Sequence, residues 1–91
     1  MAQQYGSMAE PVFYRIVRTL LRLQQQFGTT LPVTHRELAQ MSWTTTESAI
    51  RVVRKLKQQR YLMGSRGRVL ITRPQALERL LSHPTNGYRA L

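Results

Sequence analysis

Apolar residues recur with helical spacing in the first third of the chain. They fall three or four positions apart and form one broad face of a helix: Phe13, Ile16, Val17, Leu20, Leu23 and Phe27. Pro11 suits the first turn of this helix, and Gly28 suits its C-terminal cap. We therefore expect a helix from Pro11 up to Gly28, followed by a connector whose Leu31 and Val33 enter the core.

The next stretch carries two helix-start signals ten residues apart. In Thr34-x-x-Glu37 the threonine hydroxyl accepts a hydrogen bond from an orphan backbone amide, while the glutamate reaches back to the threonine amide; this is a capping box. Thr44-x-x-Glu47 repeats the pattern. Two helices that begin this close together need a tight turn between them, which is typical of a helix-turn-helix.

The first helix of this pair is expected over about residues 35–41, and the turn over residues 42–44. We expect its inward side chains to be Leu38, Ala39 and Met41. Trp43, in the turn, is expected to lie in the core or to be half-buried, as large aromatic side chains usually are.

The second helix of the pair, expected to run to about residue 60, has two distinct faces. One is an apolar stripe with spacing i, i+3, i+4, i+7, formed by Ala49, Val52, Val53 and Leu56. The opposite side has the same spacing and consists of Glu47, Ile50, Arg51 and Arg54. A helix that packs by one face and presents glutamate and arginine on the other suits the major groove of DNA.

A basic β-hairpin is predicted after this helix. Two β-prone runs, at residues 61–63 and 68–71, flank the four-residue loop Gly64-Ser65-Arg66-Gly67. A last helix begins near Pro74 and ends before residue 83. The predicted fold is mainly α with a small β-hairpin, a winged helix-turn-helix over residues 11–82, with an N-terminal arm at 1–10 and a C-terminal tail at 83–91.

The net charge of the chain indicates which kind of partner it binds. The chain has 91 residues, enough for one domain, and a formal net charge of +10. Most of its fourteen basic residues lie in the second half of the domain: Arg51, Arg54, Lys55, Lys57, Arg60, Arg66, Arg68, Arg73 and Arg79. Such an excess indicates a polyanionic partner, although a merely solvated basic surface is the alternative.

Several classes of site and protein are disfavoured. The chain has no cysteine, and His35 and His83 lack acidic companions that would complete a metal site, so we expect no metal or other cofactor. No nucleophile–base pair or glycine-rich phosphate loop supports catalysis, so no catalytic residue is assigned. No apolar run approaches the length of a membrane span, and we expect a soluble, cytoplasmic protein.

From about Pro11 to Leu81 the chain resembles the C-terminal DNA-binding domain of the Crp/Fnr (cyclic-AMP receptor and fumarate-nitrate regulator) family of bacterial transcription regulators. The matching segments are RIVRTLLRLQQQFG, VTHRELAQ, ESAIR, GSRGRVLI and PQALERL. The resemblance implies a parent with a sensor β-barrel and a long dimerisation helix, of which residues 1–10 would be the end. A short, sensor-free regulator is the alternative. The implied partners are double-stranded DNA and a second subunit of a homodimer, with RNA polymerase as a further candidate.

The resemblance also implies site residues. Glu47 and Arg51 match the glutamate and arginine that contact bases in the family, and Thr46 and Ile50 would tune the preferred sequence. The expected phosphate contacts are Thr34, His35, Thr45, Ser48, Arg54, Arg66 and Arg68.

Two questions stay open at this stage. If Thr44 caps the helix, Glu47 belongs to the cap; if Thr45 does, Glu47 is available to bases. In the unbound domain Glu47 and Arg51 could also form an exposed ion pair. The alternative functions are a winged-helix protein–protein assembly module and a winged-helix regulator of another family.

Overall fold

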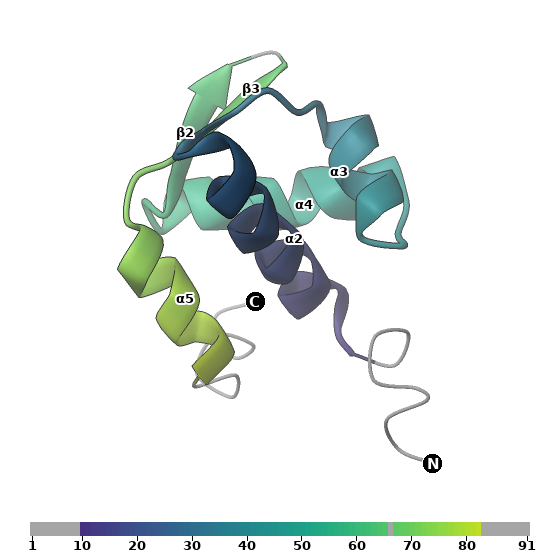
Figure 1. Ribbon diagram of the computed structural model, residues 1–91. Helices are drawn as coiled ribbons and strands as arrows, with labels where there is room; N and C mark the ends of the chain where they lie inside the picture. Colours follow the sequence, from purple (N-terminus) through teal and green to yellow (C-terminus); the bar gives the residue numbers. More distant parts are fainter. Residues whose placement is uncertain (1–9, 66, 83–91) are drawn as a thin grey trace.

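The computed structural model describes residues 10–65 and 67–82 (Figure 1). The elements within these ranges are α2 (Val12–Phe27), β1 (Thr30–Leu31), α3 (His35–Met41), α4 (Thr46–Gln58), β2 (Leu62–Ser65), β3 (Arg68–Ile71) and α5 (Pro74–Ser82). The predicted C-terminal tail, all but the last residue of the predicted N-terminal arm, and Arg66 lie outside the described residues.

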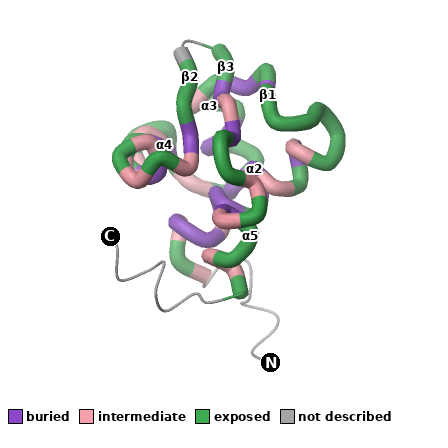
Figure 2. The backbone as a smooth tube through the Cα atoms, turned by 90° about the vertical axis from the view of Figure 1, so that its left-hand side faces the viewer, coloured by how far each residue is buried: buried purple, intermediate pink, exposed green. Residues whose placement is uncertain are grey.

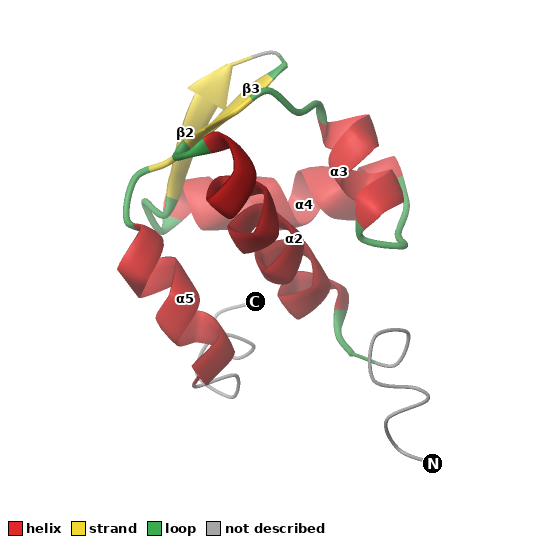
Figure 3. Cartoon of the chain, viewed as in Figure 1, coloured by secondary structure: helices red, strands yellow, loops and turns green. Residues whose placement is uncertain are grey.

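Helix α2 occupies the centre of the domain, and α3, α4 and α5 pack around it (Figures 1 and 3). Its predicted apolar face is buried except at the C-terminal end, where Phe27 is 49% exposed. The same core takes in Leu38 from α3, Leu56 from α4 and Leu77 from α5, each fully buried. Figure 2 shows the buried positions of the chain gathered where these elements meet. One apolar core therefore holds all the described helices together.

The sheet has one strand more than the sequence predicted. Its strand order is β1-β3-β2, and both pairs are antiparallel. The predicted connector supplies the extra strand, β1, with Thr30 opposite Leu70; Leu31 and Val33 are buried as expected. A strand of two residues is too short to show an alternating pattern in the sequence, so β1 can be recognised only by its pairing with β3.

The hairpin loop is shorter than expected. Ser65 pairs with Arg68, so only Arg66 and Gly67 connect the strands instead of the predicted four residues. Gly67 has φ +69°, a left-handed conformation that two-residue hairpin loops favour and that glycine adopts at little cost. The hairpin extends the β1–β3 pairing into the wing of a winged helix-turn-helix.

The turn between α3 and α4 differs from the prediction in its two largest side chains. Trp43 is 71% exposed and Met41 is 41% exposed, so their expected inward placement is wrong. Ser42 takes the inward position instead, four residues after buried Leu38, and its hydroxyl donates to Thr19 Oγ1 on α2 at 2.8 Å. Trp43 then follows with φ +58°, which directs the chain away from the core.

Candidate nucleic-acid interface

Helix α4 begins at a cap supplied by Thr45. The Thr45 side chain accepts a hydrogen bond from the backbone amide of Ser48 at 3.1 Å, and its hydroxyl donates to Ser48 Oγ at 3.1 Å. Of the two caps that the sequence left open, the structure therefore has Thr45 and not Thr44, and the helix begins at Thr46. Glu47 is the second residue of the helix, and its carboxylate is not used in the cap.

The exposed face of α4 carries the residues expected to contact bases. Thr46, Glu47 and Arg51 are exposed, and Ile50 is half-buried. Glu47 and Arg51 form no ion pair, since the described residues contain a single one, between Glu10 and Arg18. The pair that the sequence left open is therefore absent, and both side chains extend into solvent.

The opposite face of α4 fixes this orientation. The predicted apolar stripe of Ala49, Val52, Val53 and Leu56 is buried, as expected, where α4 meets α2 and α3. Burying a Val or Leu side chain contributes about 1.5–3 kcal/mol. Rotating the helix so that another face pointed outward would expose this stripe, so packing determines which side chains face a ligand.

The C-terminal end of α4 is closed by a Schellman motif. The Tyr61 amide donates to the Leu56 carbonyl at 2.9 Å, and the Arg60 amide donates to the Lys57 carbonyl at 3.0 Å. Arg60 occupies the left-handed position with φ +67°, where glycine is usual. This termination ends the helix at Gln58, slightly earlier than the sequence indicated.

The linker between β3 and α5 holds the same end of α4. Arg73 donates from Nη2 to the Gln59 carbonyl at 2.7 Å and from Nε to the Arg60 carbonyl at 3.3 Å. The Thr72 hydroxyl also donates to the Arg60 carbonyl, at 2.7 Å, and the Arg73 guanidinium lies 5.1 Å from the centre of the Tyr61 ring. The sequence alone does not reveal this role, because Thr72 and Arg73 lie more than ten positions from the carbonyls they contact.

The N-terminus of α3 lies beside α4 and carries two predicted phosphate contacts. The Thr34–Glu37 capping box is confirmed: Thr34 Oγ1 accepts from the Glu37 amide at 3.0 Å, and Glu37 Oε1 accepts from the Thr34 amide at 2.9 Å. His35 is half-buried at the start of the helix. Burial, together with the nearby positive charge of Lys57 on α4, lowers the pKa of His35.

A hollow of about 450 Å³ separates the start of α2 from the side of α4. It is bordered by Pro11 on one side and by Ser48, Arg51, Arg54 and Lys55 on the other. Lys55, for which the sequence predicted no role, extends the basic face of α4 toward α2. Its only sequence signal was its place on the flank of the exposed stripe.

The wing contributes one described basic residue from the predicted set. Arg68 is exposed on β3 opposite Ser65, while Arg66 lies outside the described residues. Helix α4 contacts α3 and also β2 of the wing. Those predicted contact residues that the structure describes thus lie on three elements, the N-terminus of α3, the exposed face of α4 and the wing, and α4 contacts the other two.

Neither a metal centre nor a membrane-spanning helix occurs in the described part of the chain. Across residues 10–65 and 67–82, no group of three or more His, Asp or Glu side chains is arranged to hold a metal ion. In those same ranges no helix has the length and apolar character needed to cross a membrane.

Comparison with known proteins identifies the family to which this domain belongs. The family model of the Crp-like helix-turn-helix domain matches residues 14–80. The catabolite activator protein of Thermus thermophilus is similar in structure, with a TM-score of 0.72 and 27% identity over 76% of this chain and 33% of that protein. A CRP/FNR-family transcriptional regulator, also from Thermus thermophilus, has a TM-score of 0.76 and 22% identity over 87% and 45% of the two chains, which supports the fold. No curated protein sequence matches the chain.

This chain spans about a third of the first of these structures and under half of the second. The winged helix-turn-helix fold and the resemblance to the Crp/Fnr family, both predicted from the sequence, are confirmed. The chain belongs to the family of Crp-like helix-turn-helix domains, which are DNA-binding domains of transcription regulators.

Proposed function

We propose that this domain binds double-stranded DNA sequence-specifically, with α4 in the major groove and the wing on the adjacent backbone. The observation that carries the proposal is that α4 has one buried apolar face and one exposed charged face. The buried residues are Ala49, Val52, Val53 and Leu56, and the exposed ones are Glu47, Arg51 and Arg54. An α-helix fits the major groove, and a chain of net charge +10 is attracted to a polyanion.

Base contacts are assigned to the first two turns of α4. Arg51 is suited to donate two hydrogen bonds to guanine O6 and N7, and Glu47 to accept one from a cytosine amino group. The absence of a cap bond or an ion pair on Glu47 supports this role, because no bond within the described residues must break before it meets a base. Thr46 and Ile50 tune the preference, and the half-buried Ile50 offers methyl groups to a thymine methyl.

Phosphate contacts surround this region and set the register of the helix. Thr34 and His35 lie at the N-terminus of α3, and Thr45 and Ser48 at the N-terminus of α4, where the helix dipole also favours an anion. Arg54 lies further along α4, and Arg66 and Arg68 belong to the wing. Such contacts position the protein but carry little sequence information themselves.

The parent protein is proposed to act as a homodimer that binds two half-sites, with RNA polymerase as a further partner. One domain covers only one half-site, so the isolated chain should bind with about micromolar or weaker affinity and gain strongly when two copies are tethered. The alternative of a winged-helix assembly module is less well supported for α4, because its exposed face is polar where an assembly face would be apolar.

The test is a selection of binding sites followed by a salt titration. Two tethered copies of the chain would be used to select duplexes from a randomised pool, and the affinity for the selected half-site would then be measured between about 50 and 200 mM salt. Neutralising even a few phosphates should make the affinity fall by about tenfold or more over this range. An affinity that does not change with salt, or a pool that yields no preferred sequence, would refute the proposal.

A further inference from the structure

A small hollow lies between α2 and the turn that joins α3 to α4. Its volume is about 160 Å³, and no residue of α4 lines it. The side chains around it include three arginines from α2, two exposed apolar residues from the end of α3 and the turn, and one glutamate: Arg15, Arg18, Arg22, Met41, Trp43 and Glu10. We call this region the turn hollow.

Trp43 is the most unusual residue of the turn hollow. It has φ +58°, a conformation that bulky side chains rarely adopt and that glycine adopts readily. Its side chain is 71% exposed, so burial in this domain does not offset that backbone conformation. Arg15 on α2 stabilises the turn, because its Nη2 donates a hydrogen bond to the Trp43 carbonyl at 3.3 Å. The fold therefore presents a large aromatic side chain outward on a fixed turn.

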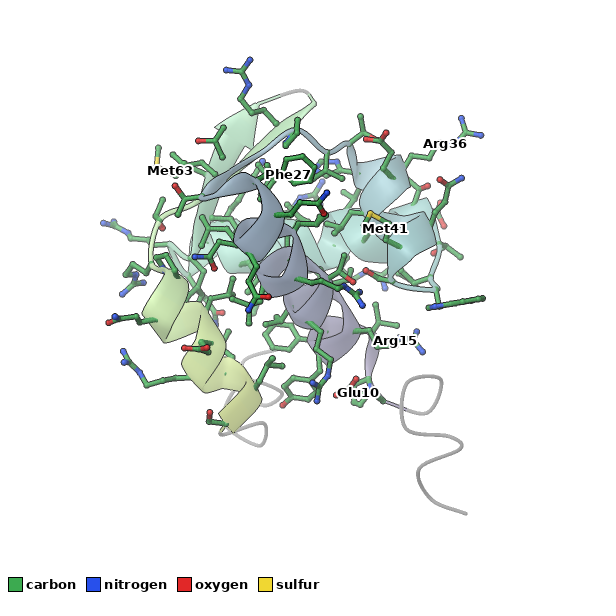
Figure 4. The ribbon with its side chains drawn as sticks, viewed as in Figure 1. Glu10, Arg15, Phe27, Arg36, Met41 and Met63 are labelled. Carbon is green, nitrogen blue, oxygen red and sulfur yellow. The ribbon has the colours of Figure 1, made fainter. Side chains whose placement is uncertain are left out.

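Exposed apolar side chains gather on this side of the molecule. Of the four large apolar residues that are exposed in the described chain, Phe27, Met41 and Trp43 lie here, while Met63 lies apart on β2. Met41 borders both the turn hollow and a second hollow of about 430 Å³ that also contains Phe27. Figure 4 shows Met41 between Phe27, at the C-terminal end of α2, and the pair Arg15 and Glu10, at its N-terminal end. Aromatic residues, methionine and arginine together are typical of protein interfaces.

The turn hollow already holds one carboxylate. Both oxygens of Glu10 accept from Nε of Arg18, at 3.1 and 3.0 Å. Arg22 borders the same hollow from the next turn of α2, with Arg22 Nη2 donating only a long bond of 3.4 Å to Thr19 Oγ1. A carboxylate from another molecule could pair with Arg18 or Arg22 in the same way, next to the apolar side chain of Met41 or Trp43.

From these observations we infer that the turn hollow is a docking site for an acidic segment of a partner protein. An aromatic or aliphatic side chain of that segment packs on Trp43 and Met41, and neighbouring Asp or Glu side chains pair with Arg18 and Arg22. Glu10 occupies part of the site in the free domain and competes with the partner. Because α4 does not line the site, the partner and DNA can bind at the same time.

The first test uses a library of 12-residue peptides selected against the chain with a short DNA duplex present to cover the DNA-binding face. Selected peptides are expected to combine acidic residues with an aromatic or aliphatic anchor. Trp43→Gly and Arg18→Gln should each lower their affinity about tenfold, the size of effect expected at an interface hot spot. Glu10→Gln should raise it severalfold, because a competing carboxylate is removed.

Matched controls separate this inference from the proposed DNA function. Met63→Ser removes an equally exposed apolar residue elsewhere and should leave peptide affinity unchanged, as should Arg51→Ala, which alters the DNA-binding face. Trp43→Gly suits the left-handed backbone of the turn, so a loss of binding cannot be ascribed to unfolding. Peptides without acidic residues, or peptides that bind wild type and Trp43→Gly equally, would overturn the inference.

The second test asks whether DNA covers the turn hollow. Trp43 is the only tryptophan in the chain, so its fluorescence reports on this site alone. Acrylamide should quench it equally well with and without a bound duplex. Protection by DNA would assign the hollow to the DNA interface and overturn the inference of a protein partner.

Discussion

Replacing Arg60 by glycine should stabilise the domain. Arg60 occupies the left-handed position of the Schellman motif at the end of α4, with φ +67°. Its carbonyl accepts from Thr72 and Arg73, but these are backbone contacts that glycine keeps. The described structure shows no hydrogen bond or ion pair made by the exposed Arg60 guanidinium, so removing this side chain should lower the free energy of unfolding very little.

The expected gain follows from two opposing terms. A left-handed conformation costs an L-residue about 1–2 kcal/mol, a cost that glycine does not have. Glycine in turn loses more conformational entropy on folding, which costs about 0.5–1 kcal/mol. The net stabilisation should therefore be about 0.5–1 kcal/mol, which corresponds to a rise in Tm of about 2–8 °C for a domain of this size.

The assay is thermal and urea unfolding of the wild type and three variants. Arg60→Gln removes the charge but keeps the side-chain carbon that causes the conformational cost, so it should not reproduce the gain. Gln59→Gly changes the preceding residue, whose φ of −88° is ordinary, and should destabilise the domain. If Arg60→Gly destabilises the domain as Gln59→Gly does, the explanation of how α4 ends is wrong.

Three further predictions concern the stability of α3 and α4. Thr45→Ala should cost about 1 kcal/mol in the free energy of unfolding because it removes the α4 cap, whereas Thr44→Ala should change it by less than about 0.5 kcal/mol; equal effects in urea unfolding would contradict the observed cap. The pKa of His35 is lowered in the folded domain, so protonation favours unfolding and stability should decrease as pH falls below about 6.5. His35→Gln should weaken that pH dependence, and an unchanged pH profile would exclude His35 as its source. Leu56→Ala should destabilise the domain by about 2–5 kcal/mol, because a fully buried side chain leaves a cavity, and a loss below about 1 kcal/mol would show that α4 is loosely packed.

The sequence predicted the helices and the wing because their signals are local. The Thr34–Glu37 capping box and the apolar stripe through Leu56 both depend on residues within two turns of one another, and the structure bears them out. The family resemblance depended on the order of such local signals. It therefore survived errors in the exact limits of α4 and of the hairpin loop.

What the sequence could not predict depends on contacts between distant residues or on one unusual backbone angle. Strand β1 forms only because Leu70 lies opposite Thr30, and Arg73 caps α4 across thirteen or more positions. Trp43 was misplaced because its size indicated burial, whereas Ser42 fills the inward position and φ +58° turns the tryptophan outward. The choice between Thr44 and Thr45 as cap likewise needed the actual geometry.

The central claim is that the exposed face of α4 distinguishes bases, and two arginines on that face test it most directly. Binding of Arg51→Ala and Arg54→Ala should be measured on the selected half-site and on all its single-base variants, at several salt concentrations. Arg51→Ala should cost about 1–3 kcal/mol on the preferred site and relax discrimination at one base pair, because it removes a base contact. Arg54→Ala should weaken all sequences about equally and reduce the salt slope by about one, because it removes a phosphate contact. If Arg51→Ala weakens every sequence equally while Arg54→Ala changes the base preference, the assignment of the recognition face is contradicted.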